Sequence, residues 1–272
     1  MKRITRNIII TVGGLLIAGI VSDINFDFRI IRPGDLAIHC FDSDYWDAKY
    51  EKSLNAKLQP DVKGIDVSHH NGSIRWDILA EKDHIQFVYI KATEGATIVD
   101  NMYAKNTVSA KDAGILVGAY HFLTTASSAE KQFENFKTAV NTTRIDLLPV
   151  LDAEKMSVNH PMTKKEYVKH VRKWVDLCKK EYGKAPIIYC SQEHYRTYFK
   201  SHFKDCPFWC GDVGATRKYV DREKWIIWQK SIRKLKGTSG SVDFNVLAPG
   251  VSLEDIQLCS STSDTGIDVS HH

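Results

Sequence analysis

The sequence predicts an α/β protein in which eight strands close into an irregular TIM-like barrel. From Gly64 onward, short runs rich in β-branched and aromatic residues alternate with longer amphipathic stretches, which is typical of βαβ units. The chain is 43% hydrophobic and 26% charged, an ordinary globular composition, and its 272 residues fit one large domain, as in many α/β barrels, or two small ones. An open doubly wound sheet is the alternative. It usually carries a glycine-rich phosphate loop after its first strand, where this chain reads SHHNG, so we do not expect a nucleotide site.

The expected elements follow from local pattern. Apolar, β-rich runs predict strands at residues 64–68, 87–92, 116–122, 147–154, 186–191, 207–212, 225–229 and 241–245. Helices are expected at 76–83, 101–113, 127–140 and 163–182. The last of these opens with the capping box TKKE, and it ends at Gly183. The final three strands leave little room for helices between them, so we expect irregularity in the last third of the barrel.

The N-terminus has the pattern of an export signal. Lys2, Arg3 and Arg6 precede an uncharged, mainly apolar run at 7–22. Its apolar centre of about 14 residues is short for a transmembrane helix, which needs about 17–25. We therefore predict a signal peptide or membrane anchor at 1–22, a linker or N-terminal arm at 23–62, the barrel at 63–259 and a linker-like tail at 260–272. The barrel is then expected outside the cytoplasm, periplasmic, secreted or anchored to the membrane.

Charge and cysteine content limit the classes of partner and site. The formal net charge of +4 is too small to indicate nucleic-acid binding. An even number of cysteines in an exported chain permits disulfides, and Cys206 could pair with Cys210 if a turn lies between them, whereas Cys190 is expected to be a buried thiol. No C-x-x-C or H-E-x-x-H pattern occurs, so we expect no metal site and no cofactor. His121 is expected to be a structural histidine.

Two carboxylates at the end of the fourth strand are the sharpest functional signal. In a (β/α) barrel, functional residues collect at the carboxyl ends of the strands. Asp152 and Glu154, in the run LLPVLDAE, are two residues apart and so share one face of that strand. Neighbouring carboxylates raise the pKa of one another, and such a pair can supply a general acid near neutral pH. A solvated strand end is the alternative interpretation.

Two more acids and several aromatic residues are expected around the same site. Asp66 and Asp243 interrupt otherwise apolar runs in the first and last strands, which are neighbours in a closed barrel. Aromatic faces stack on sugar rings, and carboxylates can protonate a glycosidic oxygen, so this set suits a saccharide. Core packing is the alternative for each aromatic. The expected substrate-binding residues at strand ends are Tyr120, Tyr189, Trp209, Trp228, Glu94 and Gln229.

The ordered motifs GIDVSHHNG, FVYIKATEG, GAYHF, PVLDAE, IIYCS, WQ and VDFN resemble the family 25 glycoside hydrolases, the N-acetylmuramidase lysozymes, over residues 63–247. The resemblance implies a (β/α)5β3 barrel and hydrolysis of the β-1,4 bond between N-acetylmuramic acid and N-acetylglucosamine in peptidoglycan. It implies Glu154 as general acid, Asp152 as its partner, and Asp66 and Asp243 as further site carboxylates. Asn71 departs from the glutamine of many members, and FWCGD departs from the common sixth-strand pattern.

Several alternatives stay open at this point. The barrel is expected to act on peptidoglycan glycan strands as a monomer. A catalytically silent barrel that binds cell-wall glycan, or a hydrolase of chitin-like polymers, would share many of these features. Retaining, inverting and substrate-assisted mechanisms are all compatible with four acids. The i, i+2 spacing of Asp152 and Glu154 favours substrate assistance, in which Asp152 orients the 2-acetamido group of the sugar.

The heptapeptide GIDVSHH occurs at 64–70 and again at 266–272. The first copy is the opening strand and delivers Asp66. The second follows the Ser/Thr-rich stretch CSSTSDT and has no further strands after it, as in a truncated tandem duplication. A tail that pairs at a sheet edge is the alternative. We expect residues 260–272 to be dispensable.

Overall fold

The computed structural model divides the chain into two compact units, residues Met1–Gln59 and Pro60–His272. It describes residues 62–141, 143–154, 160–213 and 225–258 with their side chains, and the backbone of three strands in the first unit. All ten candidate site residues lie in the described part of the second unit. The tail at 260–272 and most of the predicted arm lie outside the described residues.

The first unit contains a three-stranded antiparallel sheet of β1 (Asn7–Val12), β2 (Leu15–Ser22) and β3 (Asn25–Ile30), in that order. The first two strands fall in the predicted signal segment. The third falls in the segment predicted as a linker or N-terminal arm, and its sequence NFDFRI alternates polar and apolar residues with the two-residue period of a strand. No helix among the described residues is long and apolar enough to cross a membrane.

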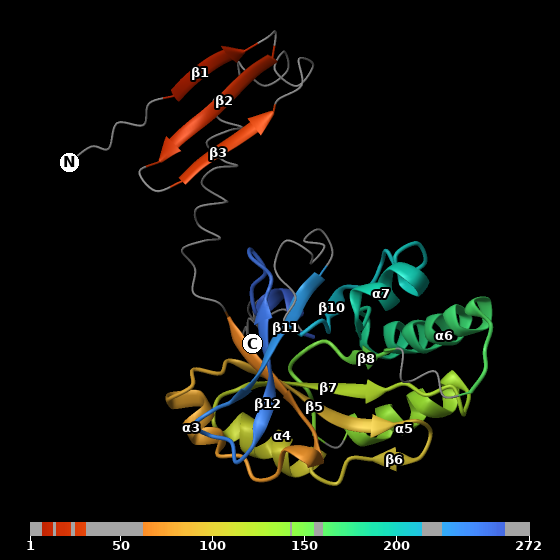
Figure 1. Cartoon of the computed structure of the whole chain (residues 1–272). Helices are drawn as coiled ribbons and strands as arrows, with labels where there is room; N and C mark the ends of the chain where they lie inside the picture. The colour runs from red at the N-terminus through yellow and green to blue at the C-terminus, as the bar shows by residue number, and fades with distance from the viewer. Residues whose placement is uncertain are drawn as a thin grey trace, which may run out of the picture. The chain divides into compact units, whose positions relative to one another are not determined.

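The second unit is a closed barrel, as predicted (Figure 1). Its strands are β4 (Lys63–Val67), β5 (Phe87–Glu94), β7 (Leu116–Phe122), β8 (Val150–Asp152), β9 (Ile187–Cys190), β10 (Phe208–Cys210), β11 (Trp225–Lys234) and β12 (Ser241–Leu247). They pair in the order β4-β12-β11-β10-β9-β8-β7-β5, and the additional pairing of β4 with β5 closes the sheet. Neighbours are parallel except where β12 pairs with β11 and β4.

Helices follow the first five barrel strands. They are α3 (Trp76–Glu81), α4 (Tyr103–Asp112), α5 (Ala129–Asn141), α6 (Lys164–Tyr182) and the short α7 (Gln192–His194), which continues into a π-helical turn at Tyr195–Phe199 (Figure 1). Thr163 and Glu166 form the predicted capping box of α6, and Gly183 ends it in the left-handed conformation at φ 73°. The described chain after β9 supplies three further strands, which gives the predicted (β/α)5β3 order. The two-residue strand β6 (Ile98–Val99), antiparallel to β5, was not predicted because it is too short to show a period.

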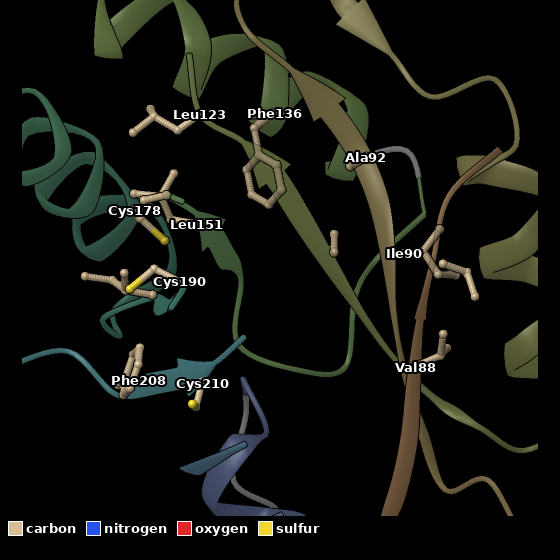
Figure 2. Packing of buried hydrophobic residues seen from close by; sticks show 14 of the residues in the cluster. Val88, Ile90, Ala92, Leu123, Phe136, Leu151, Cys178, Cys190, Phe208 and Cys210 are labelled. Atoms are coloured by element: carbon tan, nitrogen blue, oxygen red, sulfur yellow. The ribbon is translucent and has the colours of Figure 1, made fainter. Parts of the chain in front are cut away.

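Two hydrophobic clusters pack on the two faces of the barrel sheet. Phe87 and Tyr89 point into the barrel, whereas Val88 and Ile90 point to the outer cluster between sheet and helices, as the two-residue period of β5 requires. Figure 2 shows Val88, Ile90 and Ala92 along one strand of that outer cluster. Gly118 makes room for the interior rings, because a Cβ there would lie 2.2 Å from Cε1 of Tyr89. Each large apolar side chain so buried contributes about 1.5–3 kcal/mol.

The cysteines of the described barrel are thiols. Cys190 is fully buried in the outer cluster, as predicted, and Figure 2 shows it with Cys178 and Cys210 among apolar side chains. The predicted option of a Cys206–Cys210 disulfide is wrong, since both residues are free. Cys210 is the last residue of β10 (Phe208–Cys210), so extended chain stands where the pairing would need a turn. Cys40 and Cys259 lie outside the described residues.

Candidate active site

Four carboxylates gather at one end of the barrel. Asp66 on β4 and Asp243 on β12 are directly opposite one another in the antiparallel ladder. Asp152 is the last residue of β8, and Glu154 follows it by two positions. Opposed residues of an antiparallel pair have Cβ atoms about 4.5–5.5 Å apart, so the first two acids are close neighbours.

The electrostatic interactions among these acids show that the two pairs share one site. Burial, followed by the charges of Asp243 and Glu154, holds the pKa of Asp66 well above its usual value. Burial also raises the pKa of Asp152, with Glu154 and Asp66 as the next causes. The pKa values of Glu154 and Asp243 are raised by burial too, and in Glu154 the charge of Asp243 adds to the effect. At least some members of the cluster therefore keep a proton at a pH where an exposed carboxyl would have lost it.

Hydrogen bonding within the cluster is incomplete. Asn245 Nδ2 donates to Asp66 Oδ2 at 2.7 Å, which favours the ionised form of that carboxyl. Asp152 is 8% exposed, yet its Oδ1 has no hydrogen-bond partner among the described residues, and neither has Asn245 Oδ1. Buried polar atoms are rarely left unpaired, so each of these oxygens is an acceptor that an ordered water or a ligand group would satisfy.

Two tyrosines and a glutamine line the interior beside the acids. Tyr120 and Tyr189 are partly exposed and pack against the interior cluster. Tyr189 donates from its hydroxyl to Gln229 Oε1 at 2.6 Å, and Gln229 hydrogen-bonds the Asp243 carboxyl. Burial and the charges of the acids raise the pKa of both tyrosines, so their hydroxyls stay protonated and can donate hydrogen bonds.

The two predicted tryptophans are not brought to an open groove. Trp209 is 2% exposed inside the barrel, with its ring centroid 5.1 Å from Tyr89 and 5.2 Å from Tyr189. Trp228 is 4% exposed, belongs to the outer cluster and donates from Nε1 to the carbonyl of Asp212 at 3.1 Å. Both residues therefore pack in the core, which was the alternative interpretation for each aromatic.

A lysine joins the site on its β5 side. Glu94 ends β5, and its Oε2 lies 2.6 Å from Lys91 Nζ, which also sits 5.0 Å from the centre of the Phe122 ring. The charge of Lys91 lowers the pKa of Asp152, and that of Glu94 raises it. The sequence singled out the acids, but Lys91 and Asn245 are equally part of this environment. Both are polar residues within otherwise apolar strands, and this is the sequence signal that identifies them as site residues.

His121 lies outside this cluster. It is fully buried on the outer face of β7, where its ring nitrogens contact Thr93 Oγ1 at 2.7 Å and Gln132 Oε1 at 3.1 Å. Burial lowers its pKa to about 4, so the ring is neutral at physiological pH. It is a structural histidine, as the sequence analysis expected.

Comparison with known proteins agrees with this architecture. The family model described as glycosyl hydrolases family 25 matches residues 65–235. An uncharacterized protein, YegX, of Escherichia coli K12 is 35% identical over 190 residues, covering 68% of this chain and 69% of that protein. Lysozyme M1 of Streptomyces globisporus is 31% identical over 212 residues, covering 72% and 70%. The structure of a family 25 glycosyl hydrolase from Bacillus anthracis superposes with a TM-score of 0.62 at 34% identity, covering 68% of this chain and 88% of that one.

Proposed function

The chain belongs to glycosyl hydrolase family 25 and is a glycoside hydrolase of the muramidase type, and we propose that it hydrolyses the β-1,4 bond between N-acetylmuramic acid and N-acetylglucosamine in peptidoglycan. The observation that carries the proposal is the pairing of Asp152 and Glu154 at the end of β8 within a cluster whose carboxyl pKa values are raised. Lysozyme M1, a relative of this chain, supports the same class of substrate.

Glu154 is the general acid in this proposal. It is half-buried, and burial together with the charge of Asp243 raises its pKa. A carboxyl group that retains its proton near the working pH can deliver it to the glycosidic oxygen as the bond to the anomeric carbon breaks. The resulting carboxylate then accepts a proton from the water that completes hydrolysis.

Asp152 orients the nucleophile. Its Oδ1 lacks a hydrogen-bond partner among the described residues, and in this proposal it accepts a hydrogen bond from the N–H of the sugar's 2-acetamido group. In the substrate-assisted route the acetamido carbonyl oxygen attacks the anomeric carbon while the leaving oxygen takes the proton of Glu154. Water then opens the cyclic intermediate at the same carbon, which gives net retention of configuration.

Asp66 and Asp243 support the developing positive charge and hold sugar hydroxyls. Asn245 fixes Asp66, and Gln229 with Tyr189 fixes Asp243, so both carboxyl groups are oriented before substrate binds. Pre-oriented groups of this kind stabilise a transition state without having to rearrange. Tyr120, Tyr189, Glu94 and Gln229 complete the proposed binding residues.

An enzyme that acts on peptidoglycan must be exported to the compartment that contains it. Lys2, Arg3 and Arg6 before the apolar run are the basis for proposing that the N-terminal segment is a signal peptide or a membrane anchor. We further propose that the barrel acts as a monomer on the glycan strand.

The test is to identify the new reducing ends that the full chain releases from purified peptidoglycan. Fragments are reduced with borohydride and analysed by mass spectrometry, with Glu154→Gln as the control. Reduced N-acetylmuramic acid at the new ends, absent with the variant, is the expected result. Reduced N-acetylglucosamine would contradict the proposed bond, cleavage of chitin oligomers alone would indicate a chitin-type hydrolase, and binding without release would indicate a silent glycan-binding barrel.

A further inference from the structure

An aspartate–histidine pair lies beside the carboxylate cluster and has no part in the mechanism above. His69 Nδ1 is 2.7 Å from Asp100 Oδ2. The aspartate side chain is 1% exposed, whereas the histidine side chain is 40% exposed. A buried carboxylate therefore holds an imidazole ring that faces solvent.

The backbone around the pair fixes its geometry. His69 begins a 3-10 turn, His69–Asn71, that starts two residues after β4 and is capped by Ser68. The Asp100 carboxylate accepts hydrogen bonds from the backbone N–H groups of His69 at 3.0 Å and Met102 at 2.9 Å. The ring contact is thus one of three hydrogen bonds on a carboxylate that cannot move away, and the ring loses little further freedom when a ligand binds.

The hydrogen-bond pattern determines what His69 offers a ligand. Because Asp100 is the acceptor for two backbone N–H groups, the ring nitrogen beside it is assigned as a third donor, Nδ1–H. In the neutral ring the other nitrogen, Nε2, is then an acceptor. Among the described residues Nε2 has no hydrogen-bond partner, although the ring contacts that of His70 at a centroid distance of 3.8 Å.

The pair lies at the rim of the proposed active site. His69 is three residues beyond Asp66, at the carboxyl end of β4, and Asp100 follows β6, which extends the end of β5. The charge of Asp100 acts on the Tyr120 hydroxyl, as do those of Asp66 and Asp152. The exposed imidazole and the acid cluster therefore border the same region of the barrel end.

We propose that His69 is a further glycan-binding residue, in which Asp100 holds the ring so that Nε2 accepts a hydrogen bond from a hydroxyl or acetamido N–H group of the bound polysaccharide. The inference rests on the proposed function, because it takes the same glycan as ligand. Sugars present many donors of this kind. The carboxyl groups of the cluster contact the sugar ring at which the bond breaks. An acceptor at the rim of the site therefore binds the part of the glycan beyond that ring.

The test measures KM and kcat of the full chain on soluble peptidoglycan fragments for four variants. His69→Ala is expected to raise KM about tenfold with kcat changed less than about twofold, which corresponds to one lost hydrogen bond to substrate. Asp100→Asn should raise KM similarly, since it changes the tautomer that the ring prefers. The double variant should be no worse than His69→Ala alone. His70→Phe keeps a ring against His69 without its nitrogens, and it should behave as wild type.

A second readout separates this inference from the proposed function. The dissociation constant of chitotetraose and of a muramyl tetrasaccharide is measured for Glu154→Gln with and without His69→Ala. Weaker binding by about tenfold in the double variant supports His69 even if wild type fails to release muramic-acid ends. Unchanged KM and unchanged binding in well-folded His69→Ala, or an equal rise in KM in His70→Phe, would overturn the proposal. A wild-type chain that neither cleaves nor binds glycan overturns both.

Discussion

Two buried polar clusters lie on opposite faces of the same barrel strands, and they differ in how completely their hydrogen-bonding groups are paired. Tyr120 and His121 are adjacent on β7, and the first faces the acid cluster while the second faces helices α5 and α6. In the outer cluster both ring nitrogens of His121 are paired, and Gln132 bonds His121, the backbone of Thr124 and the carbonyl of Ser127. In the inner cluster like charges face one another, and Asp152 Oδ1 is unpaired within the described residues.

The difference separates a structural polar cluster from a functional one. A buried network in which every group is paired stabilises the fold and specifies one packing arrangement. A cluster of acids with raised pKa values costs stability, so its presence in the fold is explained by what it binds. Residues of the inner cluster should therefore govern activity with little loss of stability, and residues of the outer cluster should do the reverse.

Asp152→Asn should strongly reduce turnover. It removes the group that we propose orients the acetamido nucleophile, so kcat on peptidoglycan should fall about 100-fold or more. It also removes a buried like charge beside Glu154, so the melting temperature at pH 7 should be unchanged or higher. Turnover and thermal melts on the same preparation check both parts. A variant that melts well below wild type would mean that Asp152 is a structural residue.

Gln132→Ala should affect stability alone. The glutamine is fully buried, and its loss leaves His121 and the Thr124 backbone without partners, at a cost of about 1–3 kcal/mol for each unpaired group. The melting temperature should fall by about 4–24 °C, while kcat and KM of the folded fraction stay at wild-type values. Thr138→Ala, at an exposed position on α5, is the matched control and should change neither. Loss of turnover in the folded fraction would remove the distinction between the two clusters.

The two clusters should respond to pH with opposite sign. The folded-state pKa values of the acids lie above their unfolded-state pKa of about 4. Their favourable contribution to the free energy of unfolding is therefore complete below pH of about 4 and is lost as pH rises. His121 has a folded pKa of about 4 against 6.5, so its contribution is present above pH 6.5 and is lost as pH falls. That loss amounts to about 3 kcal/mol.

Chemical unfolding at pH 7, 5.5 and 4 tests this opposition. The stability gain of Asp152→Asn over wild type should be largest at pH 7 and should shrink towards pH 4. In His121→Gln, the free energy of unfolding should fall less towards pH 4 than it does in wild type. If both variants shift the curve in the same direction, the signs assigned to the two clusters are wrong.

Removal of residues 260–272 should give the smallest effect, namely none. The second GIDVSHH copy follows the Ser/Thr-rich stretch CSSTSDT, which has the composition of a linker. Specific activity and melting temperature of the shortened chain should equal those of the full chain. A fall in either would assign the tail a role in the barrel.

The sequence was sufficient where a property depends on short-range pattern. All eight barrel strands and helices α3 to α6 were predicted, because β-rich runs, capping boxes and glycine stops are local signals. The cross-strand pairing of Asp66 with Asp243 followed from closing the barrel.

The faces of the tryptophans depend on details that no local pattern carries. The register between β10 and β11 shifts between Phe208 and Trp209, and a shift of one residue moves a side chain to the other face. Trp209 accordingly fills the barrel and Trp228 the outer cluster. Asp100 and His69 likewise meet only because β6 folds back on β5, and that two-residue strand leaves no trace in the sequence.

The role of Glu154 is tested by a paired measurement on Glu154→Gln, in which peptidoglycan turnover and melting temperature are determined on one preparation at pH 7. We predict that turnover falls by about 10²–10⁴-fold, the usual contribution of a general acid, while the melting temperature stays equal to wild type or rises. A variant that still releases muramic-acid ends at the wild-type rate would contradict the assignment of Glu154 as the acid.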